Sequence, residues 1–272
     1  MAKLFDEFSR VVPTWQAAVK YLHTQPKRKA QNLILEIQDP LTISDADREV
    51  MRMVDAALEG KGLWPLNSVA GTIFPLDLYR RYGRPAFYHE FERMMQRGKA
   101  PGWGTYARRM ISRRGKKRGE IINPLDTIVE RISSAGQPQG KSYVNSYELG
   151  VVVPEEDLVD AAPDLFADTP TYSPDTDSNE WYGFPCLSHV SFKRVEEDAR
   201  HAVNLTAVYR SHHYCARGLG NLLGLAQLQW FVAKEADLKI GTLTCISTAA
   251  ELDTRSWSDG ISVATAIASK AL

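Results

Sequence analysis

Two short segments of the sequence hold the side chains best suited to chemistry. Residues 184–194 are FPCLSHVSFKR and carry Cys186 directly after a proline. Residues 209–221 are YRSHHYCARGLGN and carry the adjacent pair Arg210 and Ser211, followed by two histidines. A guanidinium beside a hydroxyl matches the oxygens of a phosphate, and a cation beside a cysteine favours the nucleophilic thiolate. The two segments together predict a reactive thiol near an anion-binding site.

The same histidines, with a nearby cysteine, raise the alternative of a metal site. Because side chains alternate along a strand, His212 and His213 would face opposite ways and would not ligate one ion together. One face would hold Ser211, His213 and Cys215, and the other would hold Arg210, His212 and Tyr214. A zinc ion would need two further ligands beyond His213 and Cys215, and the sequence has no HxxxH or CxxC pair to supply them. We therefore expect no metal, and simple packing at a strand end is the more ordinary role for these two residues.

The composition is that of an ordinary globular protein. The chain has 272 residues, of which 44% are hydrophobic and 24% are charged. Its formal net charge is zero, so there is no global electrostatic reason to expect a nucleic-acid or membrane partner. The N-terminus lacks an apolar signal region, and no apolar run approaches the roughly 18 residues of a membrane span. Three widely spaced cysteines indicate a reducing compartment, so we expect a cytoplasmic protein.

The order of predicted elements favours an α+β fold. Short segments rich in residues that favour extended structure predict strands at 32–44, 142–153, 189–194, 204–211 and 239–248. An apolar segment at 219–236 predicts a helix buried on most of its surface. Strands and helices do not alternate regularly, which argues against a doubly wound sheet. We expect residues 1–272 to form a single domain, with an acidic loop or lid at 155–183.

Three positions predict helix starts from their capping chemistry. Thr14 precedes the apolar pattern of the first helix. Ser44, followed by Asp47, opens the helix that comes next. Asn123 is followed by Pro124 at the first helical position, which is the preferred place for proline.

Three segments, two of which include the candidate residues above, resemble the thymidylate synthase and pyrimidine hydroxymethylase superfamily. They are PCLSHVSF at 185–192, YRSHHYCARGLGNLLGLAQLQWFVA at 209–233, and LKIGTLTCIST at 238–248. That superfamily has a Pro-Cys nucleophile, an Arg-Ser pair at a strand end, an Asn at the next helix and a strand that opens with Gly. The spacing from Arg210 to Asn221 matches without a gap, and WGTYARR at 103–109 matches more loosely. The resemblance covers about residues 100–253 and is clearest over 184–246.

The resemblance implies a transferase of nucleotide biosynthesis that acts at C5 of a pyrimidine nucleotide. Cys186 would add to C6, so that C5 attacks a one-carbon unit from 5,10-methylenetetrahydrofolate. Arg210 and Ser211 would hold the phosphate, and Arg210 would lower the pKa of Cys186. Asn221 offers one acceptor and one donor, which complement N3–H and O4 of uracil. The implied fold is the three-layer thymidylate synthase-like α+β fold, whose large mixed sheet is packed by helices and forms a homodimer interface.

Other candidate residues follow from the same resemblance. Candidates for contacts with base, sugar or folate are His213, Trp103, Tyr106, Glu251 and Asp253. Lys141 would reach the phosphate bound by the partner subunit. The chain also departs from the family: Leu187 replaces a His, and the family's catalytic Glu aligns near Asn67. These departures favour hydroxymethylation over methylation. They leave open the base, the sugar, and the alternative of a nucleotide-binding or regulatory protein that kept the fold without the chemistry.

Overall fold

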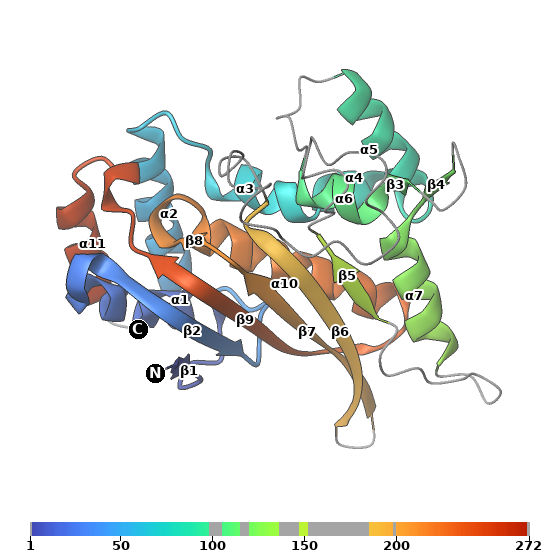
Figure 1. Ribbon diagram of the computed structural model, residues 1–272, viewed down its shortest axis with the longest axis horizontal. Coiled ribbons are helices and arrows are strands. Elements are labelled where there is room, and N and C mark those ends of the chain that lie inside the picture. The colour runs from blue at the N-terminus through green and yellow to red at the C-terminus, as the bar shows by residue number, and fades with distance from the viewer. Residues whose placement is uncertain are drawn as a thin grey trace, which may run out of the picture.

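The computed structural model describes residues 2–97, 105–114, 120–135, 147–151, 185–197 and 200–270. Trp103, Lys141 and the predicted acidic loop at 155–183 lie outside the described residues. Within the described part, the chain has an α+β fold in which helices pack on one large mixed sheet (Figure 1). The α+β prediction is therefore confirmed, while the three-layer arrangement and the dimer stay predictions.

The described part of the sheet contains seven strands. Six follow the spatial order β1 (Lys3–Phe5), β2 (Lys29–Ile37), β9 (Lys239–Glu251), β7 (Arg200–Tyr209), β6 (Leu187–Glu197) and β5 (Glu148–Gly150). The seventh, β8 (His212–His213), pairs with the end of β9. β1 with β2 and β7 with β9 are parallel pairs, whereas β2 with β9, β6 with β7 and β5 with β6 are antiparallel. A separate short ribbon joins β3 (Arg113–Arg114) to β4 (Ile121–Ile122).

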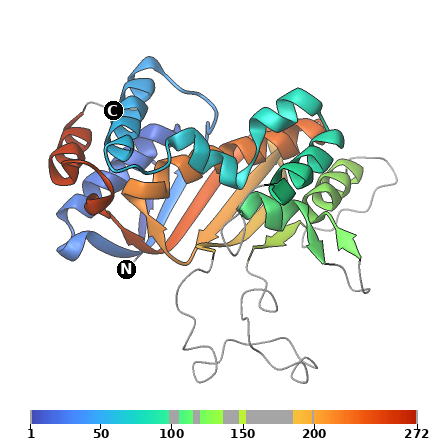
Figure 2. The same ribbon diagram turned by 90° about the horizontal axis from the view of Figure 1, so that it is seen from above.

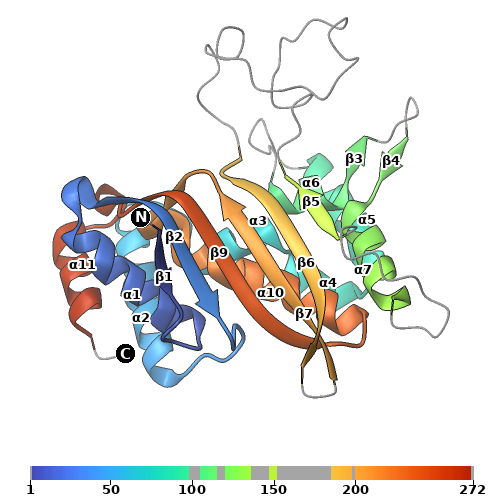
Figure 3. The same ribbon diagram turned by 60° about the horizontal axis from the view of Figure 1, so that its bottom comes forward.

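The described helices lie on one side of the sheet (Figure 2). They are α1 (Val11–Thr24), α2 (Asp45–Glu59), α3 (Leu66–Ile73), α4 (Leu76–Tyr82), α5 (Ala86–Arg97), α6 (Tyr106–Ile111), α7 (Pro124–Ser134), α10 (Leu219–Glu235) and α11 (Gly260–Ser269). Figure 3 shows the opposite face of the strands, which no described helix covers. None of the described helices combines the length and the apolar character that crossing a membrane requires.

Helix α10 lies against the sheet and is tightly packed against α3. An added Cβ at Gly220 would lie 2.6 Å from the Cβ of Val69, and one at Gly224 would lie 2.8 Å from the backbone oxygen of Ala70. Both distances are too short for a real side chain, so the two glycines allow the helices to approach this closely. The chain segments that lead into α3 and α10 are consequently held near one another.

Two of the three predicted helix starts are confirmed. The Ser44 hydroxyl accepts a hydrogen bond from the Asp47 N–H, and the Asp47 carboxylate accepts one from the Ser44 N–H, which completes the capping box. Asn123 caps α7 by accepting from the Asp126 N–H at 2.9 Å. Gly60 is the C-cap residue of α2.

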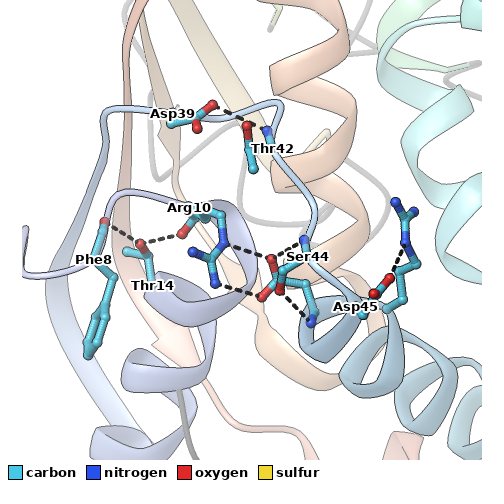
Figure 4. A network of polar contacts seen from close by, with 9 residues as sticks. Phe8, Arg10, Thr14, Asp39, Thr42, Ser44 and Asp45 are labelled. Carbon is cyan, nitrogen blue, oxygen red and sulfur yellow. Dashed lines mark hydrogen bonds and ion pairs between the residues drawn. The ribbon is translucent and has the colours of Figure 1, made fainter.

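The prediction for Thr14 is wrong, because α1 begins at Val11. The Thr14 hydroxyl instead donates within the first helical turn, to the Arg10 carbonyl at 2.7 Å. The guanidinium of Arg10 forms an ion pair with the Asp47 carboxylate at 2.8 Å. Figure 4 shows Arg10 close to Ser44, the cap of α2. This long-range pair joins the start of α1 to the start of α2. Such a tertiary contact is invisible in the local sequence.

Candidate active site

The segment that joins β7 to α10 is bent, although it returns to the sheet at β8. β7 ends at Tyr209, the chain bends at Arg210 and Ser211, and after β8 a π-helical turn spans Tyr214–Gly218. The predicted strand alternation is therefore wrong. Arg210 is exposed whereas His212 and Tyr214 are buried, although the alternation would place all three on one face. The bend reverses the direction of the side chains.

Cys186 lies at the start of β6, beside this bend. The Arg210 N–H donates to the Cys186 carbonyl at 2.9 Å, and the Arg210 Nε donates to the Pro185 carbonyl at 3.1 Å. The candidate nucleophile and the candidate phosphate ligand are thus joined through the backbone at one end of the sheet. Cys186 is partly exposed, whereas Cys215 and Cys245 are buried.

Opposing effects act on the Cys186 thiol. Burial raises its pKa above the ordinary value for cysteine, and the positive charges of Arg210 and Arg217 act in the opposite direction. The expected lowering by Arg210 is therefore present, but burial outweighs it. The other thiols are far less acidic, because burial raises the pKa of Cys245 to about 12 and that of Cys215 higher still.

Tyr106, from α6, lies close to the same thiol. Its ring is buried, and burial, together with the charge of a Cys186 thiolate, raises its pKa to about 12. The backbone N–H groups of Leu187 and Cys186 act the other way, because they donate toward its phenol oxygen. Tyr106 is therefore a candidate for base, sugar or folate contacts whose hydroxyl the structure brings against the nucleophile segment.

Asn221 belongs to a chain of buried polar groups. Its Nδ2 lies 3.2 Å from Nε2 of His212, and Nδ1 of His212 lies 2.9 Å from the Ser247 hydroxyl. The Tyr214 hydroxyl is 3.1 Å from the same serine oxygen, and the Tyr209 ring stacks on His212 with centroids 4.0 Å apart. Burial lowers the pKa of His212 to about 3, so its imidazole is neutral.

The two predicted sugar contacts both have protein partners. Glu251 forms an ion pair with Lys29 at 2.9 Å. Asp253 accepts from the backbone N–H groups of Cys215 at 2.8 Å and Ala216 at 3.2 Å. Asp253 therefore fixes the π-helical turn, which gives this carboxylate a structural role.

The remaining predicted positions lie in the bend, on β8 and on α3. His213 is exposed in β8, and Ser211 is partly exposed next to Arg210. Asn67, where the family's Glu aligns, is exposed on α3. No group of three or more His, Cys, Asp or Glu side chains within the described residues is arranged to hold a metal ion.

The structure adds a residue pair that the sequence motifs do not reveal. The Arg217 guanidinium lies 4.8 Å from the ring centre of Trp64, within the range of a cation–π contact. Arg217 also acts on the Cys186 thiol, and 46% of Trp64 is exposed. Close packing of α3 on α10 brings the two residues together, so no local sequence signal would find the pair.

Comparisons with known proteins give a partial likeness. No family model matches the chain. A protein of Methanococcoides burtonii, named "Putative thymidylate synthase", is 34% identical to it over 73 residues. The match takes in 27% of this chain and spans about a third of that relative's length, 32%. This likeness supports a relation at the level of the thymidylate synthase superfamily, over part of the chain.

Proposed function

We propose that this protein transfers a one-carbon unit to C5 of a pyrimidine nucleoside monophosphate through a covalent adduct on Cys186. The observation that carries the proposal is the position of Cys186. Among the described cysteines, Cys186 is partly exposed. Its carbonyl accepts a hydrogen bond from the Arg210 N–H. The positive charges of Arg210 and Arg217 act to lower the pKa of its thiol. The partial likeness to a thymidylate synthase agrees with this chemistry.

The covalent step would begin at the Cys186 thiol, which gives up its proton while its sulfur bonds to C6 and the C5–C6 electron pair moves onto C5 and O4. C5 would then form a bond to the one-carbon unit and lose its own proton to a base, and the bond between the one-carbon unit and the folate nitrogen would break, with its electron pair leaving on that nitrogen. Water that adds to the one-carbon unit and loses a proton would give a hydroxymethyl product, the outcome we favour, whereas a hydride, which the folate would supply by its own oxidation to dihydrofolate, would give a methyl product. In either case the returning electron pair would expel the Cys186 sulfur and restore the C5–C6 double bond.

Arg210 and Ser211 would bind the phosphate, because a guanidinium fork and a hydroxyl pair well with its oxygens. The exposure of Arg210 at the strand end suits this role. Lys141 of a partner subunit would add a further cation. Asn221 would contact the base.

Among the described residues, Trp64 and Arg217 are suited to contact a folate. The half-exposed indole of Trp64 is a flat aromatic surface beside Arg217, which suits a pterin ring and an anionic tail. When bound, 5,10-methylenetetrahydrofolate would supply the one-carbon unit.

We also propose that two copies of the chain pair through the uncovered face of the sheet. Ile34, Val208 and Ile246 are partly exposed cross-strand neighbours at the centre of this face. Their alternation with buried residues leaves an apolar stripe away from the helices. Val208→Lys would convert a dimer to a monomer in analytical ultracentrifugation, and a chain that is monomeric without this change would contradict the pairing.

A tritium-release assay tests the proposed chemistry. The protein is mixed separately with UMP, dUMP, CMP and dCMP, each labelled at C5. Reversible addition of the thiol exchanges this tritium with water, so we expect release from one of them. Cys186→Ala should abolish release, and Cys245→Ala, which removes a buried thiol, should retain it. No release from any nucleotide that binds would contradict the proposal.

A second candidate function is nucleotide binding without chemistry. The observation in its favour is that burial outweighs the two cations at the Cys186 thiol, which keeps the group protonated near neutral pH. Nucleotide binding that survives Cys186→Ala, with no tritium release from the parent protein, would identify this function.

A further inference from the structure

A cavity lies between α4, α10 and the loop that joins β2 to α2. Its volume is about 400 Å³, which is within the range of small-molecule sites. The loop side of the cavity is apolar, and Leu76 and Arg80 form its α4 side. None of the described residues that line it is a candidate residue of the site around Cys186. The cavity is therefore a separate feature of the molecule.

One wall of the cavity is a stripe of side chains on α10. Leu223, Gln227 and Trp230 line it, and because they are three or four residues apart they lie on one face of the helix. Asn221 and Gln229 direct their amides to groups of the sheet and belong to another face of α10. The stripe thus leaves the helix on a side that the sheet does not use.

The loop that faces this stripe is fixed at both ends. The Asp39 N–H donates to the Ser9 carbonyl at 2.8 Å, and the Asp39 carboxylate accepts from the Thr42 N–H at 3.2 Å (Figure 4). The capping box of Ser44 holds the other end. Leu41 lies between these two anchors and is exposed at the cavity. The loop wall is consequently formed before any ligand binds, which lowers the entropy cost of binding.

Arg80 brings a positive charge to the cavity. Arg84, four residues further along, pairs with the Asp126 carboxylate at 2.6 Å, whereas Arg80 has no ion-pair partner among the described residues. No acidic side chain is among the described residues that line the cavity. Nζ of Lys234 lies 4.9 Å from the ring centre of Trp230, so a second cation is close. A guanidinium without a counter-charge beside apolar walls favours an anion that has an apolar body.

We propose that this cavity binds a small amphiphilic carboxylate, whose apolar body lies along the α10 stripe and whose carboxylate pairs with Arg80. An unbranched aliphatic acid suits the walls, because most of the lining side chains are aliphatic. The Gln227 amide and the Trp230 indole N–H offer further donors. The concave shape suits a small molecule better than a protein surface. This site does not depend on the proposed nucleotide chemistry.

Calorimetry with octanoate tests the site in the parent and in two arginine variants. Arg80→Gln removes the charge at the cavity, whereas Arg81→Gln removes an exposed neighbouring charge that does not line it. We expect octanoate to bind about tenfold more weakly to Arg80→Gln and equally well to Arg81→Gln, because hydrogen bonds between ionised groups are the stronger kind. Octanol lacks the charge, so its affinity should be the same in all three proteins.

Two further comparisons separate the possible outcomes. Leu41→Ser removes apolar surface at the cavity, so it should weaken the binding of octanoate and of octanol alike. Octanoate binding should persist in Cys186→Ala and in the presence of excess UMP, because the cavity is separate from the candidate active site. The proposal would be overturned by a parent that does not bind octanoate, by equal octanoate affinities of Arg80→Gln and Arg81→Gln, or by displacement of octanoate by UMP.

Discussion

Helix α10 carries two buried amides, and their partners differ in kind. Gln229 is fully buried, and its Nε2 donates to the backbone carbonyls of Val203, Gly241 and Thr242 at 2.8, 2.9 and 3.2 Å. These carbonyls lie where the register between β7 and β9 shifts. Asn221, two turns closer to the start of the helix, gives its Nδ2 to the side chain of His212.

The two amides lie toward opposite ends of α10. We call the part around Gln229 the scaffold end and the part around Asn221 the site end. Backbone carbonyls neither titrate nor change tautomer. The hydrogen bonds of Gln229 therefore hold α10 on the sheet where the register between β7 and β9 shifts. His212 is ionisable and is itself oriented by Ser247. Nδ2 of Asn221 therefore contacts a side chain, whereas Nε2 of Gln229 contacts the backbone, and Oε1 of Gln229 is buried without a hydrogen-bond partner among the described residues. A buried amide is thus informative about function only through its partners.

The largest expected effect is at the site end. Arg210→Gln should weaken nucleotide binding by about a hundredfold, because hydrogen bonds between ionised groups are roughly twice as strong as neutral ones. Calorimetry with a nucleoside monophosphate measures the loss, and the matching nucleoside serves as control because it lacks the phosphate. Equal losses for nucleotide and nucleoside would show that Arg210 does not bind the phosphate.

A smaller effect is expected at the scaffold end. Gln229→Leu should lower the free energy of unfolding by about 2 kcal/mol, because three backbone carbonyls lose their donor. Urea denaturation measures this change, and the affinity for a nucleotide should stay the same. A change in nucleotide affinity without a loss of stability would reverse the assigned roles of the two amides.

The pH dependence of stability sharpens the comparison further. The folded pKa of His212 is about 3, below the ordinary value of 6.5, so the unfolded chain binds more protons between these values. Stability should therefore fall as the pH drops below 6.5, by about 1 kcal/mol per pH unit from this group. His212→Phe should lose this part of the dependence, while Gln229→Leu should retain it. Identical slopes for His212→Phe and the parent would contradict a buried neutral His212.

The smallest expected effect concerns Arg217. Arg217→Gln removes a positive charge that favours the Cys186 thiolate, so alkylation by iodoacetamide at pH 8 should slow by about threefold, since exposed charges act weakly. Arg48→Gln, on the exposed surface of α2, serves as a matched control and should leave the rate unchanged. Faster alkylation of Arg217→Gln would show that the guanidinium shields the thiol rather than activates it.

Local sequence patterns predict a large part of this fold. Capping chemistry places the starts of α2 and α7, and the apolar segment at 219–236 predicts α10 almost to the residue. The strands β6, β7 and β9 also follow from their composition. The helix caps depend on contacts between near neighbours in the chain, and the strands on the types of their own residues, both of which the sequence displays directly.

The arrangement around the candidate site depends on contacts that are distant in sequence. The bend after Tyr209 forms because β8 pairs with the end of β9, more than 30 residues away. The pairing buries His212 and sets it against Asn221. The contact of Arg217 with Trp64 requires the close packing of α3 on α10. For these reasons the motif predicts Cys186 and Arg210 as site residues, but it indicates neither the contact of His212 with Asn221 nor the charge of Arg217 near the thiol.

A covalent trapping experiment tests the central claim most directly. The protein is incubated with 5,10-methylenetetrahydrofolate and either 5-fluoro-UMP or 5-fluoro-dUMP, and the intact mass and peptide masses are measured. Because fluorine does not leave C5 as a proton does, the complex should remain joined to the protein at Cys186. A bound nucleotide with no mass increase, or an adduct that persists in Cys186→Ala, would contradict the account.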